Sequence, residues 1–223
     1  MSEQVLPFYL VCDESYSMQG APLDAINREL PEIYREIASN PVVADKIRLG
    51  VIGFSTTANV LLPLADLNEL QSIPQLSPQG VTNYGAAFSR LRTTIEQDIR
   101  ELKQAGHVPF RPTVFFLTDG QPTDDWHAEH QRLTDPGFSA RPTILAFGFG
   151  EAELATLQQV TTFRAFIADP DVAPTHALRE FAKQLLNSVV HSAIASSSNS
   201  SGGAQLVVPD QIKGYTVLAA DPV

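Results

Sequence analysis

Three short polar segments carry Asp, Ser and Thr side chains directly after or between apolar runs of the sequence. They span residues 13–17 (D-E-S-Y-S), 80–85 (G-V-T-N-Y-G) and 118–124 (T-D-G-Q-P-T-D). Oxygen atoms are the ligands that hard cations such as Mg²⁺ prefer, and Mg²⁺ tends to keep several of its waters. The residue types therefore favour a site for a hard cation.

The spacing of Asp13, Ser15 and Ser17 predicts that their side chains converge. In an extended segment alternate residues point the same way, so three oxygens at i, i+2 and i+4 would face one point. Two hydroxyls and few direct carboxylates would leave a bound cation under-neutralised. Such an ion would attract one further carboxylate from outside the chain.

Each segment also has an ordinary structural interpretation. Asp and Ser after a strand are common helix caps, and Asp119-Gly120 is a common turn. The joint occurrence of all three segments at one edge of a sheet would favour the cation site, so the elements that position them decide the question.

The elements alternate between strands and helices. Apolar, β-rich runs predict strands at 5–12, 47–54, 59–64, 113–117, 143–149 and 164–167, the third at or near a hairpin turn. Apolar residues spaced by three and four predict helices at 23–38, 84–105, 124–133, 151–160 and 175–195. This alternation predicts an α/β fold, a doubly wound, mostly parallel sheet with helices on both faces. In such sheets ligands bind beyond the carboxyl ends of the strands, where the polar segments fall.

On these residues the chain resembles the von Willebrand factor A domains. Asp13-x-Ser15-x-Ser17, then Thr82, then Asp119 in Thr-Asp-Gly is similar to the metal-ion-dependent adhesion site of that family. The resemblance covers about residues 4–190. It implies a Rossmann-like sheet with Mg²⁺ at its edge, Mn²⁺ and Ca²⁺ being alternatives. It further implies that Ser15 and Ser17 bind the ion directly, Thr82 directly or through water, and Asp13 and Asp119 largely through water and hydrogen bonds.

The resemblance also implies a partner and a setting. The open position on the ion would take an Asp or Glu carboxylate from a protein partner. Residues 117–126 (L-T-D-G-Q-P-T-D-D-W) resemble the bacterial TerY-type branch, tied to tellurite resistance and stress signalling and associated with kinases and phosphatases. Tyr16 stands where many members have Gly, so its ring is expected near the ion, where it could shape partner access.

An enzyme is the competing interpretation. Asp13 after an apolar strand suggests a metal-dependent phosphohydrolase with an aspartate nucleophile, but such enzymes look for a second Asp two residues on, where this chain has Ser15. No G-x-S-x-G elbow occurs. We therefore expect a binding module without catalytic residues.

Composition narrows the partners and the compartment. The 223 residues hold 25 acidic and 15 basic side chains, a formal net charge of −10, which weighs against nucleic acid. The single cysteine, Cys12, excludes an internal disulfide and a cysteine-built zinc site, and it is expected to be a buried apolar residue. No apolar run approaches the ~20 residues that span a bilayer, and the acidic start does not resemble a signal peptide. We expect a cytoplasmic protein without membrane contact.

The expected organisation is a domain over residues 1–195, a Ser/Gly-rich linker over 196–203 and a tail over 204–223. The apolar tail could form an extra strand or hairpin, or serve as a docking peptide.

Three further features have modest interpretations. His127 and His130 favour a solvated helix over a zinc site. Residues 148–150 (G-F-G) favour a tight strand-to-helix turn over a dinucleotide loop. For Trp126, an exposed binding anchor and a buried packing residue are equally favoured.

Overall fold

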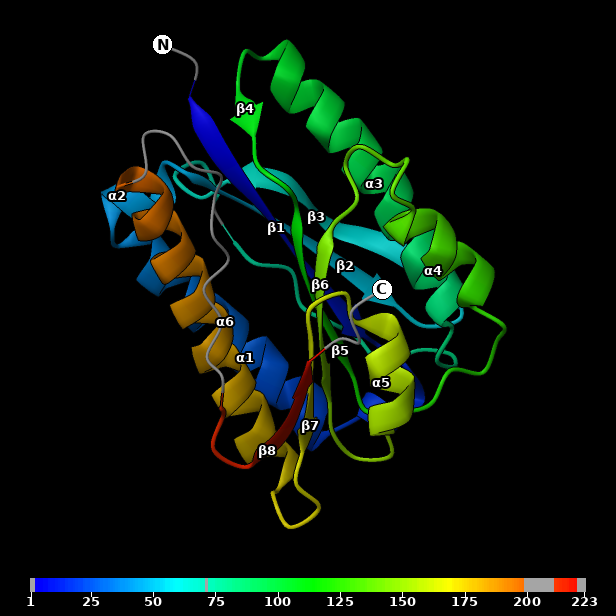
Figure 1. Ribbon diagram of the computed structural model, residues 1–223. Helices are drawn as coiled ribbons and strands as arrows, with labels where there is room; N and C mark the ends of the chain where they lie inside the picture. Colours follow the sequence, from blue (N-terminus) through cyan, green and yellow to red (C-terminus); the bar gives the residue numbers. More distant parts are fainter. Residues whose placement is uncertain (1–2, 71, 199–210, 220–223) are drawn as a thin grey trace.

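The structure, a computed structural model, describes residues 3–70, 72–198 and 211–219 and has a central sheet between two layers of helices (Figure 1). The strands are β1 (Gln4–Asp13), β2 (Ile47–Phe54), β3 (Ala58–Asp66), β4 (Val108–Pro109), β5 (Thr113–Thr118), β6 (Thr143–Gly148), β7 (Arg164–Ala168) and β8 (Tyr215–Ala219). Their order is β3-β2-β1-β5-β6-β7-β8, with β4 beside the start of β1. Only the β2–β3 and β7–β8 pairs of this described sheet are antiparallel. The predicted mostly parallel, doubly wound sheet is confirmed.

The helices are η1 (Tyr16–Met18, a 3₁₀ turn), α1 (Ala21–Ala38), α2 (Pro41–Ala44), α3 (Tyr84–Gln104), α4 (His127–Thr134), α5 (Leu154–Val160) and α6 (Pro174–Ser198). Helices α1 and α6 cover one face of the sheet, and α3, α4 and α5 cover the other (Figure 1). Residues 5–12 of β1 are buried because both faces of the strand are covered: Phe8 and Leu10 belong to one core, Tyr9 and Val11 to the other.

Two predicted helices begin later than expected. The helix predicted from residue 124 begins at His127, because the Asp124 carboxylate binds the backbone of α3 instead. The helix predicted from residue 151 begins at Leu154, after a turn in which Gly150 has φ 64°. The short elements η1, α2 and β4 were not predicted, since two to four residues carry no readable periodicity.

The end of the chain adds an edge strand. Strand β8 runs antiparallel to β7, and the Tyr215 hydroxyl donates to the Ala177 carbonyl of α6 at 2.6 Å. This matches the extra-strand alternative for the tail. Helix α6 reaches Ser198, three residues into the predicted linker, while residues 199–210 lie outside the described part of the chain. The division into domain, linker and tail stays a prediction.

An aromatic cluster joins the sheet to the start of α3. Phe116 of β5 lies with ring centroids 5.1 Å from Phe54, 5.0 Å from Tyr84 and 5.4 Å from Phe88. Trp126 is only 3% exposed and packs on Tyr84 and Phe88. Of its two interpretations, the packing residue is therefore the one that the structure supports. No helix within the described ranges is long and apolar enough to cross a membrane.

Replacing Phe116 with Ala should destabilise the fold strongly, because a fully buried ring would leave a cavity between β5 and α3. We expect a loss of about 3–5 kcal/mol in the free energy of unfolding, measured by urea denaturation. Phe163→Ala is the matched control, since that ring is 37% exposed, and it should change stability by about 0.5 kcal/mol or less. Equal losses in both variants would contradict this account of the core.

Candidate metal centre

The three polar segments meet beyond the carboxyl ends of β1 and β5, where the strand order reverses. The Ser15 and Ser17 hydroxyl oxygens lie 2.9 Å apart, and the Ser17 hydroxyl donates to Asp119 Oδ1 at 2.7 Å. Ser17 is exposed, whereas Ser15 and Asp119 are buried. The cluster therefore reaches solvent on the side of Ser17.

The Asp13 carboxylate lies beneath these groups and joins the two strands. It is fully buried; Oδ1 accepts the Ser15 N–H at 2.8 Å, and Oδ2 accepts the Thr118 hydroxyl at 2.6 Å. Asp13 thus fixes the position of Ser15 and ties the end of β1 to the end of β5.

The route by which the serines converge differs from the prediction. The backbone does not stay extended: Ser15 is the last extended residue, and Tyr16–Met18 form the 3₁₀ turn η1. The alternation argument was wrong for Ser17, because η1 rather than the pleat of a strand brings its hydroxyl beside Ser15.

Thr82 faces the same space from the second segment. A Cβ built on Gly120 would lie 3.5 Å from the Thr82 hydroxyl oxygen and 3.8 Å from that of Ser17. The missing side chain of Gly120 therefore leaves room between these two hydroxyls. The Thr82 carbonyl accepts bonds from the Thr123 N–H and hydroxyl, both at 2.8 Å, which hold the second segment against the third.

Two acidic residues have roles that the sequence did not reveal. Glu14 was grouped with the oxygen donors, but its carboxylate turns away and accepts the Ser77 N–H at 2.9 Å. Asp124 accepts the N–H groups of Tyr84 and Gly85 at 2.9 and 2.8 Å, at the N-terminus of α3. An acidic residue beside an N-terminal turn is a known cap, but Asp124 is 39 residues or more from these groups in the chain, so no local signal could find it.

The electrostatics of the cluster favour a cation. Burial raises the pKa of Asp13. Burial is also the main cause that raises the pKa of Asp119 to about 6, and the nearby negative charge of Asp13 raises it further. No Lys, Arg or His of the described chain forms an ion pair with either carboxylate. A cation beside them would offset this burial, and the oxygen-only donor set suits a hard one.

The donor set is hydroxyl-rich, unlike many metal sites. Within residues 3–70, 72–198 and 211–219, no group of three or more His, Cys, Asp and Glu side chains is placed to hold a metal. Any ion here would therefore depend on the Ser and Thr hydroxyls as much as on Asp13 and Asp119.

The remaining sequence candidates lie elsewhere or are structural. His130 bonds to the Val160 carbonyl at 2.8 Å, and His127 lies 3.0 Å from Asp125. Cys12 is fully buried, and burial raises the pKa of its thiol well above the usual range. Gly150 N-terminal to α5 occupies a tight turn, as expected. Tyr16 is 63% exposed beside the cluster.

Comparison with known proteins decides the family. A sequence model of the von Willebrand factor type A domain matches residues 8–189. The chain belongs to this family. Domains of the family are typically interaction modules rather than enzymes, and a divalent metal at a metal-ion-dependent adhesion site is typical of them. No curated protein sequence matches the chain.

Solved structures share the fold. Proximal thread matrix protein 1 from the mussel byssus has a TM-score of 0.60 and 17% identity, covering 85% of this chain and 49% of its own. A second structure of that protein, with a zinc-occupied adhesion site, has a TM-score of 0.58 and 16% identity, with 85% and 48% covered. The pilus adhesin SpaC from Lactobacillus rhamnosus GG has a TM-score of 0.64 and 14% identity, with 84% and 30% covered. This chain thus spans half or less of these proteins.

Asp124→Ala should loosen the start of α3, because the N–H groups of Tyr84 and Gly85 would lose their common acceptor. We expect a loss of about 1–2 kcal/mol in the free energy of unfolding, measured by urea denaturation. Asp125→Ala removes a neighbouring carboxylate that is 90% exposed and whose bonds in the described chain are to His127, so its effect should be much smaller. A larger effect from Asp125 would show that Asp124 does not hold the helix.

Proposed function

We propose that the chain is a metal-dependent protein-binding module in which Asp13, Ser15, Ser17, Thr82 and Asp119 hold Mg²⁺. The observation that carries this is the meeting of Ser15, Ser17 and Asp119 within hydrogen-bond distance at a solvent-facing sheet edge, beside the buried Asp13 carboxylate, which forms no ion pair with a described Lys, Arg or His. When bound, the ion would supply an electrophilic position for one Asp or Glu carboxylate of a partner.

The hydroxyl groups and the carboxylates have different roles in the proposed site. Ser15, Ser17 and Thr82 offer neutral hydroxyl oxygens, which leave the charge of a cation largely uncompensated. Asp13 orients Ser15 through its backbone, and Asp119 accepts the Ser17 hydroxyl. Both carboxylates therefore serve as charge balance and orientation close to the ion.

A protein partner fits the rim of the site. Tyr16 and Val81 are 63% and 51% exposed, and the Tyr16 N–H donates to the Gly80 carbonyl at 3.2 Å, so the two segments lie side by side. Exposed apolar side chains next to a carboxylate-binding ion would pack on a partner around its Asp or Glu.

The phosphohydrolase alternative is disfavoured by the position of Asp13. A nucleophile needs a free oxygen facing substrate, whereas both oxygens of Asp13 accept hydrogen bonds and the side chain is fully buried. We therefore propose no catalytic residue.

The finer assignments belong to the proposal alone. A role in tellurite-resistance or stress signalling and a kinase or phosphatase as partner rest on the likeness of residues 117–126 to the TerY-type branch. A cytoplasmic location is proposed from the sequence pattern described above. Mg²⁺ is proposed over Mn²⁺ and Ca²⁺ from the family resemblance, since oxygen donors suit all three ions. The zinc in the mussel protein makes Zn²⁺ a further ion to test.

Magnesium should stabilise the wild-type protein against unfolding and should not stabilise Ser17→Ala. A ligand that binds only the folded state adds about 2.7 kcal/mol at a hundredfold excess over Kd. Thermal unfolding across a magnesium series, against EDTA, measures the effect. Ser17 is chosen because it is exposed, and Ser89→Ala, an exposed serine of α3, is the matched control.

Three outcomes are distinguishable. Stabilisation lost in Ser17→Ala and retained in Ser89→Ala supports the site. If both variants are still stabilised by magnesium, the ion binds at another site. If the wild-type protein responds to none of Mg²⁺, Mn²⁺, Ca²⁺ and Zn²⁺, the proposal is overturned.

Hydrolysis of p-nitrophenyl phosphate should be absent with Mg²⁺ present, because the Asp13 oxygens are engaged. Release of p-nitrophenolate is followed by absorbance, with Asp13→Asn as the control. Turnover by the wild-type protein that disappears in Asp13→Asn would establish the phosphohydrolase instead.

A further inference from the structure

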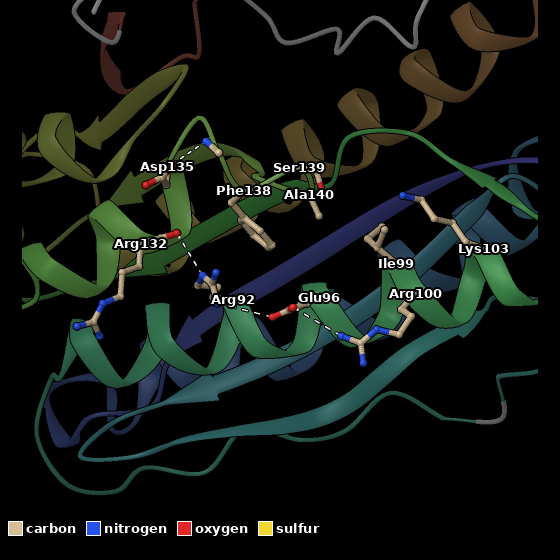
Figure 2. Close-up of a pocket in the computed structure, with 11 residues that line it drawn as sticks. Arg92, Glu96, Ile99, Arg100, Lys103, Arg132, Asp135, Phe138, Ser139 and Ala140 are labelled. Carbon is tan, nitrogen blue, oxygen red and sulfur yellow. Dashed lines mark hydrogen bonds and ion pairs between the residues drawn. The ribbon is translucent and has the colours of Figure 1, made fainter.

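A basic groove lies along α3, away from the metal centre. It runs between α3 and the loop after α4, and its volume is about 730 Å³ (Figure 2). Its charged side chains are Arg92, Arg100, Lys103 and Arg132, together with Glu96 and Asp135. These four cations lie beside Glu96, Asp135 and Glu129, the last of which pairs with Arg132, so one cation remains in excess on a chain whose formal net charge is −10.

Arg92 is held in place at the centre of the groove. Its guanidinium lies 4.7 Å from the centroid of the Phe138 ring and donates to the Arg132 carbonyl at 3.2 Å. Arg92 and Arg100 both lie 3.6 Å from Glu96, so one carboxylate serves two guanidinium groups (Figure 2). Because Arg92 and Arg100 share one carboxylate, part of their positive charge stays available to a ligand.

The outer cations are open to solvent. Arg100 and Arg132 have side chains 63% and 65% exposed, and Lys103 is exposed without an ion pair to any acidic residue of the described ranges. Arg100 pairs with Glu96, and Arg132 pairs with Glu129. Such exposed ion pairs are weak, so a ligand carboxylate can replace the glutamates at small cost.

The floor of the groove is apolar. Phe138, Ile99 and Ala140 line it between the charged groups, and Ile99 is 7% exposed. The volume of the groove falls in the range of ligand pockets, and its apolar floor lies between charged side chains. Its ligand should therefore carry both negative charge and an apolar side chain.

We propose that this groove, here named the α3–α4 groove, binds an acidic segment of a partner protein. Asp or Glu side chains of the segment would meet Arg100, Lys103 and Arg132, and an apolar side chain would lie on Phe138. Nucleic acid is the weaker ligand, because affinity for a phosphate backbone rises with the number of phosphates that Lys and Arg neutralise, and four cations line the groove around an apolar floor.

The groove is independent of the metal centre. Thr82 lies just before the N-terminus of α3, whereas the groove begins at Arg92, about 12 Å further along the helix at 1.5 Å per residue. Binding in the groove should therefore survive EDTA, and its test does not depend on the proposed metal.

The test measures fluorescence anisotropy of labelled twelve-residue peptides with the full chain in EDTA. One peptide carries Glu residues around two Leu, a second has Ser in place of Leu, and a third has Lys in place of Glu. We expect binding of the first, at least tenfold weaker binding of the second and third, and weakening as salt rises from 50 to 200 mM.

The deciding variant is Arg100→Glu with Lys103→Glu. It should weaken the first peptide at least tenfold. Arg28→Glu with Arg35→Glu is the matched control: it changes the net charge equally on α1, at side chains 55% and 64% exposed, and should change affinity less than twofold. Phe138→Ser tests the floor separately and should lower affinity for the Leu peptide but not for the Ser peptide. Unchanged circular dichroism and Tm show that each variant folds.

Several results would overturn the proposal. Equal losses in the two double variants would indicate diffuse charge attraction only. Equal affinity for the Leu and Ser peptides would remove the role of the floor. A single-stranded oligonucleotide that binds more tightly than the peptide and loses more affinity in Arg100→Glu with Lys103→Glu would make the groove a nucleic-acid site. The absence of peptide binding at 50 mM salt would refute it outright.

Discussion

A carboxylate buried at the centre of the sheet edge, that of Asp13, is the constraint that organises this end of the molecule. Burying a charge is costly unless hydrogen bonds or an opposite charge compensate it. Asp13 receives two hydrogen bonds, one from the Ser15 backbone and one from Thr118, and these bonds place the loop after β1 against the end of β5. Asp119 lies close enough to Asp13 for the two negative charges to repel. A cation would therefore join the loops after β1 and β5, which the hydrogen bonds of Asp13 already hold together.

The segment that carries Thr82 is positioned by two acidic residues outside the proposed ligand set. Glu14 binds the Ser77 N–H, and Asp124 binds the first N–H groups of α3, so the segment that carries Thr82 is fixed at both ends. Close backbone approaches strengthen this bracing: a side chain on Gly85 would lie 2.6 Å from Asp124 Oδ2. A ligand set held by its scaffold loses little conformational freedom on binding, which is how a site of mostly neutral donors could hold a hard ion.

Features of the fold and site that depend on neighbouring residues could be predicted from the sequence, whereas contacts between distant residues could not. Strands buried on both faces appear as apolar runs, and polar residues at their ends mark the edge of the sheet, so the fold and the meeting of Ser15, Ser17 and Asp119 could be predicted. That these residues bind metal stays a prediction. Asp124 and Arg132 could not be assigned, because each acts on α3 from 39 or more residues away and nothing in its own neighbourhood indicates the contact.

Charge gives the two proposed sites a common logic. A chain with a formal net charge of −10 repels an acidic partner at long range, so binding one requires local positive charge that screening does not remove. The metal centre would supply it as an ion over Asp13 and Asp119, and the α3–α4 groove supplies it as guanidinium and ammonium groups. The metal centre lies at the N-terminal end of α3, and the groove lies along its C-terminal half. The buried face of this helix is fixed to the sheet by Tyr84 and Phe88. A partner that reached both sites would be aligned along this helix, and its acidic residues, spaced to match, would separate it from acidic proteins in general.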